Sequence, residues 1–443
     1  MADARPFHWE FKPENVDREV FRIEGGRRLE GSVRISGAKN AALKLMAAAT
    51  LTGERCRFSN VPEIEDVRVL AEVLRDIGVT VDHPEPNVYE VASGDAEWLF
   101  VPLEAAAKMR ASFILLGPLL TRFGRVIISN PGGDRIGRRP VNLHVDAMRA
   151  LGADIEYRNG YYFAKAPGRL RGGRVTFPQI TVMGTENAML AATLAVGHTI
   201  IEPAAQEPEI DDLIAFLQEM GAEVERTAPN RIEIEGQRRL RGAHHAVVAD
   251  RIEAGTFVVA AAVTRGRITV QDAPCGHLDA LLGIMSDVGV SVSSGVNTIE
   301  VDATDTDARP LRGRDIETEP YPGLATDLQP PTCVLLTQAE GDSHVNETVF
   351  EDRLEWLGEL RRMGARIDIA DQHHATIHGP TPLHGADVEI GDLRAGASLI
   401  LAALAAEGVT TIRGAHHVHR GYEKIDRKFL ELGARIERLA EGT

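Results

Sequence analysis

The chain has 443 residues, of which 44% are apolar, and its 65 acidic against 49 basic residues give a formal net charge of −16. These numbers describe a globular protein of two or more domains, and the acidic balance excludes a broad nucleic-acid-binding surface, which needs a basic stripe. No stretch has the roughly 20 consecutive apolar residues of a membrane span, so we expect no membrane partner.

The first segment in chain order, residues 1–19, carries charges throughout and lacks the apolar core of a signal peptide. We interpret it as an N-terminal extension and expect the protein to be cytoplasmic. The cysteines agree with this expectation, because Cys56, Cys275 and Cys333 are too far apart in sequence to form a zinc motif or a disulfide framework.

From residue 20 onward one pattern recurs six times. Each copy is an amphipathic helix that ends in a hydrophobic residue followed by Gly, with a β-rich stretch behind it. The glycines stand where a helix C-cap favours the left-handed conformation. They lie 68–75 residues apart, at Gly78, Gly152, Gly221, Gly289, Gly364 and Gly433.

An Ala-rich helix, a Gly turn and a β-branched strand precede this piece, as in residues 41–58 and 257–270. The unit is therefore helix–strand–helix–strands of about 70 residues, longer than the roughly 20–50 residues of solenoid repeats. Units of this length can close as two groups of three. We expect an α/β protein with one domain in residues 39–248, and a second in residues 249–443 together with the strand around 20–38.

Polar residues gather at the start of the Ala-rich helix in every unit. Free N–H groups at helix N-termini bind anions, so such starts facing a cleft would form an anion site. Thr185, Thr326 and Asp392 could instead be ordinary N-caps. Arg110 and Arg394 fit the anion site better, because a cation at this end of a helix opposes the dipole unless an anion binds beside it.

The stretch 130–140, NPGGDRIGRRP, combines a Gly-Gly turn and a single carboxylate, Asp134, with three arginines. This local excess of cations in an acidic chain indicates a small, highly charged anion. Residues 31–39 lack the Gly-Lys-Ser/Thr ending of a phosphate loop. The histidines of 373–378 and 415–420 offer no clear four-ligand set, so we expect no metal.

At this level of detail the chain resembles the UDP-N-acetylglucosamine 1-carboxyvinyltransferases, a family of enolpyruvyl transferases, from about residue 20 to 440. The resemblance implies an inside-out α/β barrel of two domains, each with three of the repeated units, around a cleft between the domains. The motifs that carry it are SGAKNAALKLMAA, MRASFILLGPL, PGGDRIGRRPVNLH, EPEI, DRIEAGTF, TDLQP, ETVFEDR, DLRAGASL and HRGYEKI.

The family's reaction moves the enolpyruvyl group of phosphoenolpyruvate onto the 3-hydroxyl of UDP-N-acetylglucosamine and releases phosphate through a tetrahedral ketal, at the first committed step of peptidoglycan precursor synthesis. The motif positions imply that Asp134 is the acid that protonates the methylene carbon and that Asp327 is the base. The cations that resemble the phosphoenolpyruvate ligands are Lys39, Arg110, Arg139 and Arg420, with Arg353 and Arg394 on the carboxylate side.

Further contacts follow from the same resemblance. Asn40 matches the residue that contacts the ketal, and Arg135 and Arg138 are expected to be solvated. No metal or organic cofactor is implied, and a monomer or weak homo-oligomer is expected. Nucleotide and sugar contacts are implied for Arg139, Pro140, Val141, Asn142, Leu143, His144, Thr181, Val182, Gly184 and Val349.

Many members of the family carry Cys where this chain has Asp134. An Asp with its ordinary pKa near 3.9 is ionised at neutral pH, so it needs a raised pKa to serve as an acid. A trianionic substrate beside it would raise the pKa, because like charges favour the protonated form.

Three further departures concern the acceptor. Met183 stands where a Gly commonly approaches the nucleotide, Asn142 stands where Asp is common, and LATD at 324–327 replaces FPTD. The alternatives are an enolpyruvyl transferase with another acceptor, such as a free nucleotide or shikimate 3-phosphate, or a silent paralogue that binds a UDP-sugar. The joint presence of four residues argues against the silent paralogue: Lys39, Asp134, Asp327 and Arg420.

Overall fold

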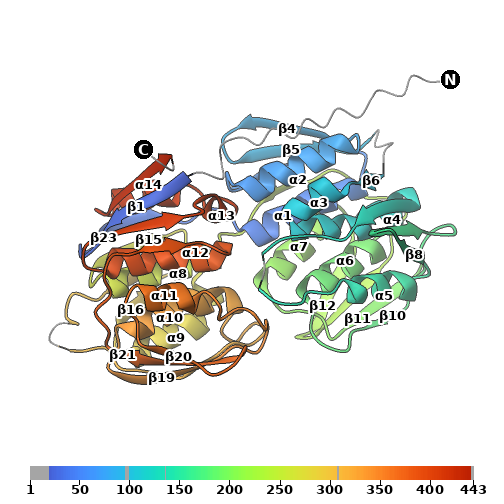
Figure 1. Ribbon diagram of the computed structural model, residues 1–443. Coiled ribbons are helices and arrows are strands. Elements are labelled where there is room, and N and C mark those ends of the chain that lie inside the picture. Colours follow the sequence, from blue (N-terminus) through green and yellow to red (C-terminus); the bar gives the residue numbers. More distant parts are fainter. Residues whose placement is uncertain (1–18, 95–98, 135, 307–308, 441–443) are drawn as a thin grey trace.

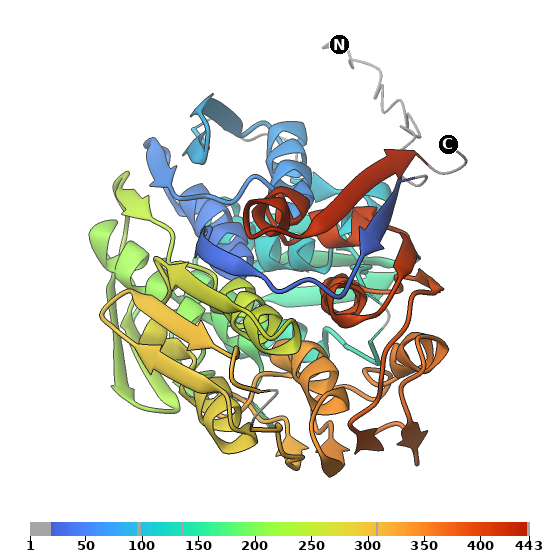
Figure 2. The ribbon, with the colours of Figure 1, turned by 90° about the vertical axis from the view of Figure 1, so that its left-hand side faces the viewer.

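The computed structural model describes residues 19–94, 99–134, 136–306 and 309–440, so most of the N-terminal extension and Arg135 lie outside the described residues. Figure 1 shows two lobes side by side, with α1–α7 in one and α8–α14 in the other. Figure 2 shows that the first strand, although N-terminal, lies among the C-terminal strands. No helix in the described ranges is long and apolar enough to cross a membrane.

The strands of the described residues form six four-stranded sheets. In the lobe of α1–α7 the sheets, in spatial order, are β14 (His244–Ala246), β3 (Cys56–Ser59), β5 (Val88–Ala92), β4 (Thr80–Glu85); β6 (Phe100–Val101), β7 (Arg125–Ser129), β9 (Tyr161–Lys165), β8 (Asp154–Arg158); and β10 (Arg174–Thr176), β11 (His198–Glu202), β13 (Arg231–Glu235), β12 (Glu223–Ala228).

The other lobe repeats this arrangement with three sheets. Their strands, in spatial order, are β2 (Glu30–Arg34), β15 (Arg267–Gln271), β17 (Thr298–Asp302), β16 (Ser291–Ser294); β18 (Ile316–Glu317), β19 (Gly341–Asn346), β21 (His374–Gly379), β20 (Ile367–Ile369); and β22 (Asp387–Glu389), β23 (Val409–Arg413), β1 (Glu19–Glu24), β24 (Arg435–Ala440). In every sheet the first pair of this order is parallel and the other two pairs are antiparallel, as β22–β23, β23–β1 and β1–β24 show.

Helices fill the inside of each lobe, and the sheets lie outside them. Strands such as β15 alternate between buried and solvent-facing residues, whereas every residue of α8 and α10 is buried. This is the inside-out arrangement of the expected fold, in which each sheet has one solvent-exposed face and the helices are buried on all sides. The helices are α1 (Lys39–Ala48), α2 (Glu65–Asp76), α3 (Leu103–Lys108), α4 (Leu116–Phe123), α5 (Asn142–Ala150), α6 (Val182–Ala192), α7 (Pro208–Glu219), α8 (Arg251–Val263), α9 (Asp279–Val288), α10 (Gln329–Thr337), α11 (Leu357–Arg362), α12 (Leu393–Ala405), α13 (His416–His419) and α14 (Ile425–Glu431).

The repeated glycines have the expected backbone. All six have φ between 91° and 105°, the left-handed region that Gly enters without a steric penalty. Each follows the second helix of its unit, where it ends the helix and turns the chain into the next strand. The prediction of left-handed C-caps is confirmed.

The N-cap interpretation holds for only one of the three residues. Asp392 caps α12, because its carboxylate accepts from the backbone N–H groups of Arg394 and Ala395. Thr185 lies inside α6 and accepts from the N–H of Ala205, while Thr326 donates to Glu347. These helices are buried, so their hydroxyl groups pair with neighbouring segments rather than with their own helix end.

Two separate hydrophobic cores match the two lobes. One is built from residues between 38 and 247, and the other from residues 21–35 and 252–436. The chain crosses between them twice, and the two crossings pair with each other through a bridge between Gly37 and Ala249. On this basis we propose residues 39–248 as one domain, and residues 20–38 with 249–443 as the other.

Candidate active site

Lys39 and Arg420 come from different lobes and meet at Asp66. Lys39 begins α1, Arg420 follows α13 directly, and Asp66 lies in the first turn of α2. Lys39 Nζ is 2.7 Å from Asp66 Oδ2, and Arg420 Nε is 3.0 Å from Asp66 Oδ1. The remaining amino group of Arg420, Nη1, pairs with a carboxylate oxygen of Asp134. The expected acid therefore lies beside two of the expected phosphoenolpyruvate ligands.

The loop that carries Asp134 follows β7 and is held by its glycines. A Cβ on Gly132 would lie 2.0 Å from the carbonyl oxygen of Ala107, so only Gly fits against α3. Gly133 has φ +107°, which a larger residue would adopt only with strain. The loop continues with Arg139, which donates to the carbonyl of Asp134.

The two arginines of this region, Arg110 and Arg139, each donate a hydrogen bond to a backbone carbonyl of the loop. Arg110 donates to the carbonyl of Arg139, which places both guanidinium groups at the same loop. Burial, together with the neighbouring Arg139, lowers the pKa of Arg110 to about 10. Burial also lowers the pKa of Arg139, against the opposing effect of Asp134. Two partly desolvated cations side by side are a favourable place for an anion.

Asp327 lies between two buried arginines of its own lobe. Its Oδ1 is 3.0 Å from Arg353 Nη2 and its Oδ2 is 3.0 Å from Arg394 Nε. Burial alone would raise the pKa of Asp327, but Arg394 and Arg353 hold it well below its ordinary value. The expected base is therefore fully ionised and paired at both oxygens.

Each of these arginines has a nitrogen that no described residue satisfies. Arg353 Nε and Arg394 Nη1 are buried and lack a hydrogen-bond partner within the described ranges. The side chains are only 2% and 4% exposed. An unmet donor on a buried cation is costly, and a second anion beside Asp327 would satisfy both nitrogens.

The same environment acts on Lys39 and Asp134. Burial lowers the pKa of Lys39, with Asp66 opposing and Arg420 and Arg394 adding to the shift. Burial would raise the pKa of Asp134, but Arg420 and Lys39 outweigh it and the pKa lies below its ordinary value. In the absence of ligand Asp134 is thus a carboxylate and not yet an acid.

The electrostatic balance of the site favours a trianion. The charged groups influence one another across the cleft, and Arg139, for example, is affected by Arg353 and Asp327 as well as by Arg420. Among the residues named above, six are cations, Lys39, Arg110, Arg139, Arg353, Arg394 and Arg420, and three are carboxylates, Asp66, Asp134 and Asp327. Just outside this set, Asp250 acts on Arg394 and Arg251 acts on Asp327, one charge of each sign. An excess of three positive charges at closely spaced donors matches an anion with both a carboxylate and a phosphate.

The residues expected at the nucleotide surround the start of α5 and of α6. Asn142 begins α5 and is exposed, next to exposed Pro140, buried Val141 and half-buried Leu143. His144 is buried and pairs through Nδ1 with the amide of Asn187 at 3.0 Å. Burial, with Arg110 nearby, lowers the pKa of His144 to about 3, so it is neutral. His144 thus links α5 to α6 from behind the site rather than facing it openly.

The start of α6 is closely packed. The Thr181 hydroxyl caps the helix by accepting from the Gly184 N–H at 3.3 Å, and a Cβ on Gly184 would lie 2.4 Å from the Thr181 side chain. Val182 and Met183 pack, partly buried, against the core of their lobe. Part of the Met183 side chain therefore packs on the core rather than facing the start of the helix alone.

Asn40 and Val349 are the remaining expected contacts. Asn40 is half-buried beside Lys39. Val349 is 39% exposed, and its N–H is held by the Glu347 carboxylate at 3.0 Å. Arg138 is exposed, as expected of a solvated residue, and its backbone N–H donates to Glu351 of the other lobe.

Two of the residues that organise the site were not among the expected site residues. Asp66 is 2% exposed and pairs with Lys39 and Arg420, but in the sequence it reads as one more acid in a helix first turn. Glu347 is fully buried and accepts from the Thr326 hydroxyl with both oxygens at 3.0 Å. Its position in ETVFEDR was the available signal.

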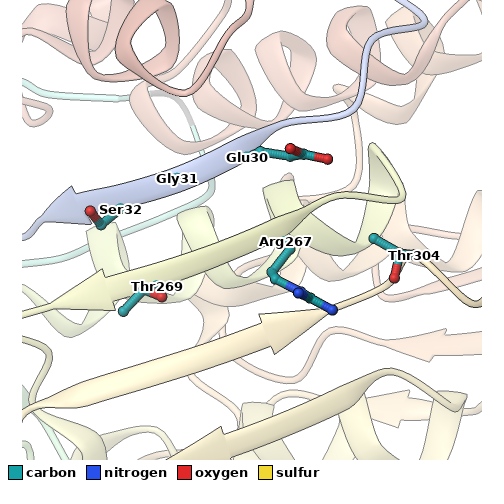
Figure 3. A pocket seen from close by; sticks show the side chains of 6 residues that line it. All are labelled: Glu30, Gly31, Ser32, Arg267, Thr269 and Thr304. Atoms are coloured by element: carbon teal, nitrogen blue, oxygen red, sulfur yellow. The ribbon is translucent and has the colours of Figure 1, made fainter.

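Two other features do not belong to the site. The hollow in Figure 3 lies on the outer face of β2 and β15, is lined by residues such as Glu30 and Arg267, and shares no residue with the charged cluster. His378 lies between Asp342 and Asp368 at 2.8 and 3.0 Å on an exposed sheet face. No group of three or more His, Cys, Asp or Glu among the described residues is arranged to hold a metal ion.

Comparisons with known proteins agree with this geometry. The family model described as EPSP synthase (3-phosphoshikimate 1-carboxyvinyltransferase) matches residues 23–429. The UDP-N-acetylglucosamine 1-carboxyvinyltransferase of Paramagnetospirillum magneticum is 44% identical over 95% of this chain and 98% of its own length. The enzyme of the same name from Solibacter usitatus is 46% identical over 95% of this chain and 100% of its own length.

Solved structures show the same architecture. The enolpyruvyl transferase NikO from Streptomyces tendae superposes with a TM-score of 0.86 at 26% identity, over 96% of this chain and 99% of its own. An EPSP synthase from Acinetobacter baumannii superposes with a TM-score of 0.74 at 19% identity, over 95% of this chain and 100% of its own. The expected α/β fold is confirmed.

Proposed function

Since this chain belongs to the enolpyruvyl transferase family, and within it to the UDP-N-acetylglucosamine 1-carboxyvinyltransferases, we propose that the cluster between its lobes carries out that transfer. The enolpyruvyl group of phosphoenolpyruvate moves to the 3-hydroxyl of UDP-N-acetylglucosamine, phosphate leaves, and the product enters peptidoglycan precursor synthesis. The observation that carries the proposal is the excess of three positive charges around Asp134 and Asp327.

Phosphoenolpyruvate fits the cluster because it brings close to three negative charges. Its phosphate is held by Lys39, Arg139 and Arg420, which act on Asp134, together with Arg110, which donates to the Arg139 carbonyl. Its carboxylate is held by the unmet nitrogens of Arg353 and Arg394. Fixed guanidinium forks stabilise the charge that develops at the reacting carbon without reorganising.

Substrate binding makes Asp134 an acid. The phosphate competes with Asp134 for Arg420, and it places negative charge beside a carboxylate that burial already disfavours. Both effects raise the pKa of Asp134, so it binds a proton that it then donates to the methylene carbon. The electron pair of the double bond forms the new C–H bond, and the cationic centre left behind takes the 3-hydroxyl oxygen.

Asp327 takes the hydroxyl proton, and substrate binding raises its pKa as it raises that of Asp134. In the unliganded protein its pairs with Arg394 and Arg353 make it a weak base. When the substrate carboxylate engages these arginines, the pKa of Asp327 rises and the carboxylate becomes a better proton acceptor. Elimination of phosphate then completes the transfer.

The cytoplasm supplies both substrates in this proposal. The three cysteines are free thiols in the structure, and we place the enzyme in that reducing compartment. A monomer or weak homo-oligomer stays a prediction.

Phosphate release from phosphoenolpyruvate tests the proposed function directly. We expect release with UDP-N-acetylglucosamine and at most about a hundredth of that rate with uridine nucleotides or shikimate 3-phosphate, because the acceptor's binding energy orients its hydroxyl group. Heat-denatured protein is the control. Release with shikimate 3-phosphate alone would show the other acceptor class, and no release with any acceptor would leave a silent UDP-sugar-binding protein.

Asp134 also predicts the response to fosfomycin, an epoxide that alkylates the thiolate carried by many relatives. We expect no time-dependent inactivation, because a carboxylate is a much poorer nucleophile than a thiolate. Asp134→Cys is expected to become sensitive and to gain one covalent adduct per chain, measured by intact-protein mass spectrometry. Stoichiometric labelling of Asp134 in the native chain would contradict this.

A further inference from the structure

Asp66 is the one carboxylate of the cluster to which the proposed mechanism gives no part. Its first oxygen pairs with Arg420 Nε at 3.0 Å, and its second lies 2.7 Å from Lys39 Nζ and 3.4 Å from Arg420 Nη2. It is 2% exposed, and the polar contacts of its carboxylate are to these two cations. A buried carboxylate that joins two expected phosphate ligands requires a reason beyond helix formation.

Resting on the function proposed above, we propose that Asp66 is a positioning residue for the transfer. It is the fixed counterion that keeps Lys39 and Arg420 side by side and keeps Lys39 protonated. Asp134, in contrast, is replaced by the substrate phosphate as the partner of Arg420 Nη1. Asp66 belongs to the lobe of residues 39–248 and Arg420 to the other, so the same contact sets the distance between the two lobes at the cluster.

The geometry of Arg420 divides its donors between two tasks. Nε and Nη2 face Asp66, and Nη1 faces Asp134. A fork held by two donors at one carboxylate has a defined plane, which fixes the direction of the third nitrogen. Nη1 can therefore exchange Asp134 for a phosphate oxygen without reorienting the guanidinium group.

The charges around Lys39 show why a permanent counterion is needed. The charged groups that act on Lys39 come from α2 (Asp66), α12 (Arg394), the end of α13 (Arg420) and the 130–141 loop (Asp134). Burial and both arginines favour neutral Lys39, whereas Asp66 and Asp134 favour the ammonium form. The carboxylate of Asp250, which caps α8, also lies close, because its Oδ2 accepts from the Lys39 backbone N–H at 3.3 Å. When the substrate phosphate replaces Asp134 at Arg420 Nη1, Asp66 is the carboxylate that stays in contact with Lys39 Nζ, at 2.7 Å.

This assignment makes a signed prediction for Asp66→Asn. Without Asp66 the pKa of Lys39 falls further, so Lys39 loses its proton at a lower pH and phosphoenolpyruvate binding weakens from the alkaline side. We expect the pH above which kcat/KM for phosphoenolpyruvate declines, its alkaline limb, to be lower by about one pH unit or more. Above that pH, kcat/KM should fall about tenfold for each further pH unit. At pH 6 the loss should be several-fold smaller than at pH 8.5.

Three comparisons separate this role from a structural one. The KM for UDP-N-acetylglucosamine should change less than about threefold, because Asp66 contacts none of the expected nucleotide residues. Asp66→Glu keeps the charge and should keep the native alkaline limb even with a lower kcat. Glu65→Gln, which removes the neighbouring acid that pairs with exposed Arg68, is the matched control and should behave as the native chain.

The outcomes decide the proposal. An equal loss at pH 6 and 8.5, or an unshifted alkaline limb, would show that Asp66 is only a structural tie between the lobes. Should Asp66→Asn fail to fold, the limb of Asp66→Glu decides, and a shifted limb there overturns the proposal. The native chain assayed in parallel separates these results from a failure of the proposed function, which would abolish phosphate release in every variant.

Discussion

Asp134→Asn is expected to lower phosphate release from phosphoenolpyruvate by about 10³- to 10⁴-fold, the upper range of a general acid's contribution. The amide keeps the size of the side chain and can still approach Arg420, but it has no acidic proton for the methylene carbon. Initial rates with saturating UDP-N-acetylglucosamine measure the effect. A variant that retains more than a tenth of the native rate would show that another group protonates the carbon.

The pH dependence of the native enzyme's turnover also tests the assignment of Asp134 as the acid. In the unliganded protein Arg420 and Lys39 hold the pKa of Asp134 below its ordinary value, so its pairing stabilises the fold above pH 4 and is lost as the pH falls through the lowered pKa. In the substrate complex the shift is reversed, and activity requires the protonated form. The kcat at saturating concentrations of both substrates, which reports groups in the substrate complex, should therefore fall as the pH rises above neutrality.

Asp134→Cys is the matched variant for this profile. A thiol with an ordinary pKa near 8.5 stays protonated to higher pH, so activity should survive and its alkaline limb should lie above that of the native chain. A native rate that stays flat up to about pH 9 would contradict a carboxylic acid in this role.

Asp327→Asn is expected to lower turnover by about 10³-fold and to lower the free energy of unfolding by about 3 kcal/mol. The first effect is the loss of the base. The second arises because Arg353 and Arg394, which are 2% and 4% exposed, would lose the carboxylate that neutralises them. Phosphate release and denaturant unfolding at pH 7 measure the two effects.

The stability difference should itself depend on pH. Arg394 and Arg353 depress the pKa of Asp327 in the folded chain, so its contribution is present above the ordinary pKa near 4 and is lost as the pH falls below it. The native chain and Asp327→Asn should therefore converge in stability in acid. Added inorganic phosphate should stabilise the variant more than the native chain, because it can serve as the missing counterion.

The matched control is Asp368→Asn. Asp368 is 80% exposed and pairs with His378 on a sheet face outside the cluster, so both activity and stability should stay within about 0.5 kcal/mol of native values. Asp327→Asn with full stability but no activity would confirm the base and refute the counterion role. Full activity would place the base elsewhere.

The repeated unit could be read from the sequence because its signals are local. The glycine that ends the second helix of each unit needs a left-handed backbone, and the Ala-rich helix shows its burial by composition alone. Six such signals at nearly constant spacing predict six α/β units before any contact is known. The strand pairing follows from this local order only in part, because β14 pairs with β3, β2 with β15, and β1 with β23 and β24, which are all distant in the sequence.

Less of the candidate site could be predicted from the sequence. Cations at helix starts indicated an anion site at Arg110 and Arg394, since a cation at this end of a helix opposes the dipole. Thr185 and Thr326 looked like N-caps but pair with distant segments in the buried interior. Asp66 carried no signal, because an acid in a helix first turn is usual wherever a helix begins.

The sequence by itself therefore determined the repeated α/β unit, its count and the left-handed turns, all of which depend on backbone preferences within a few residues. Only the tertiary structure decided which charges neutralise one another. Asp66 and Arg420 are separated by 354 residues, and Asp134 and Arg420 by 286. The pKa of each group depends on the burial and the partners that folding brings to it, and neither is encoded in the residues beside it.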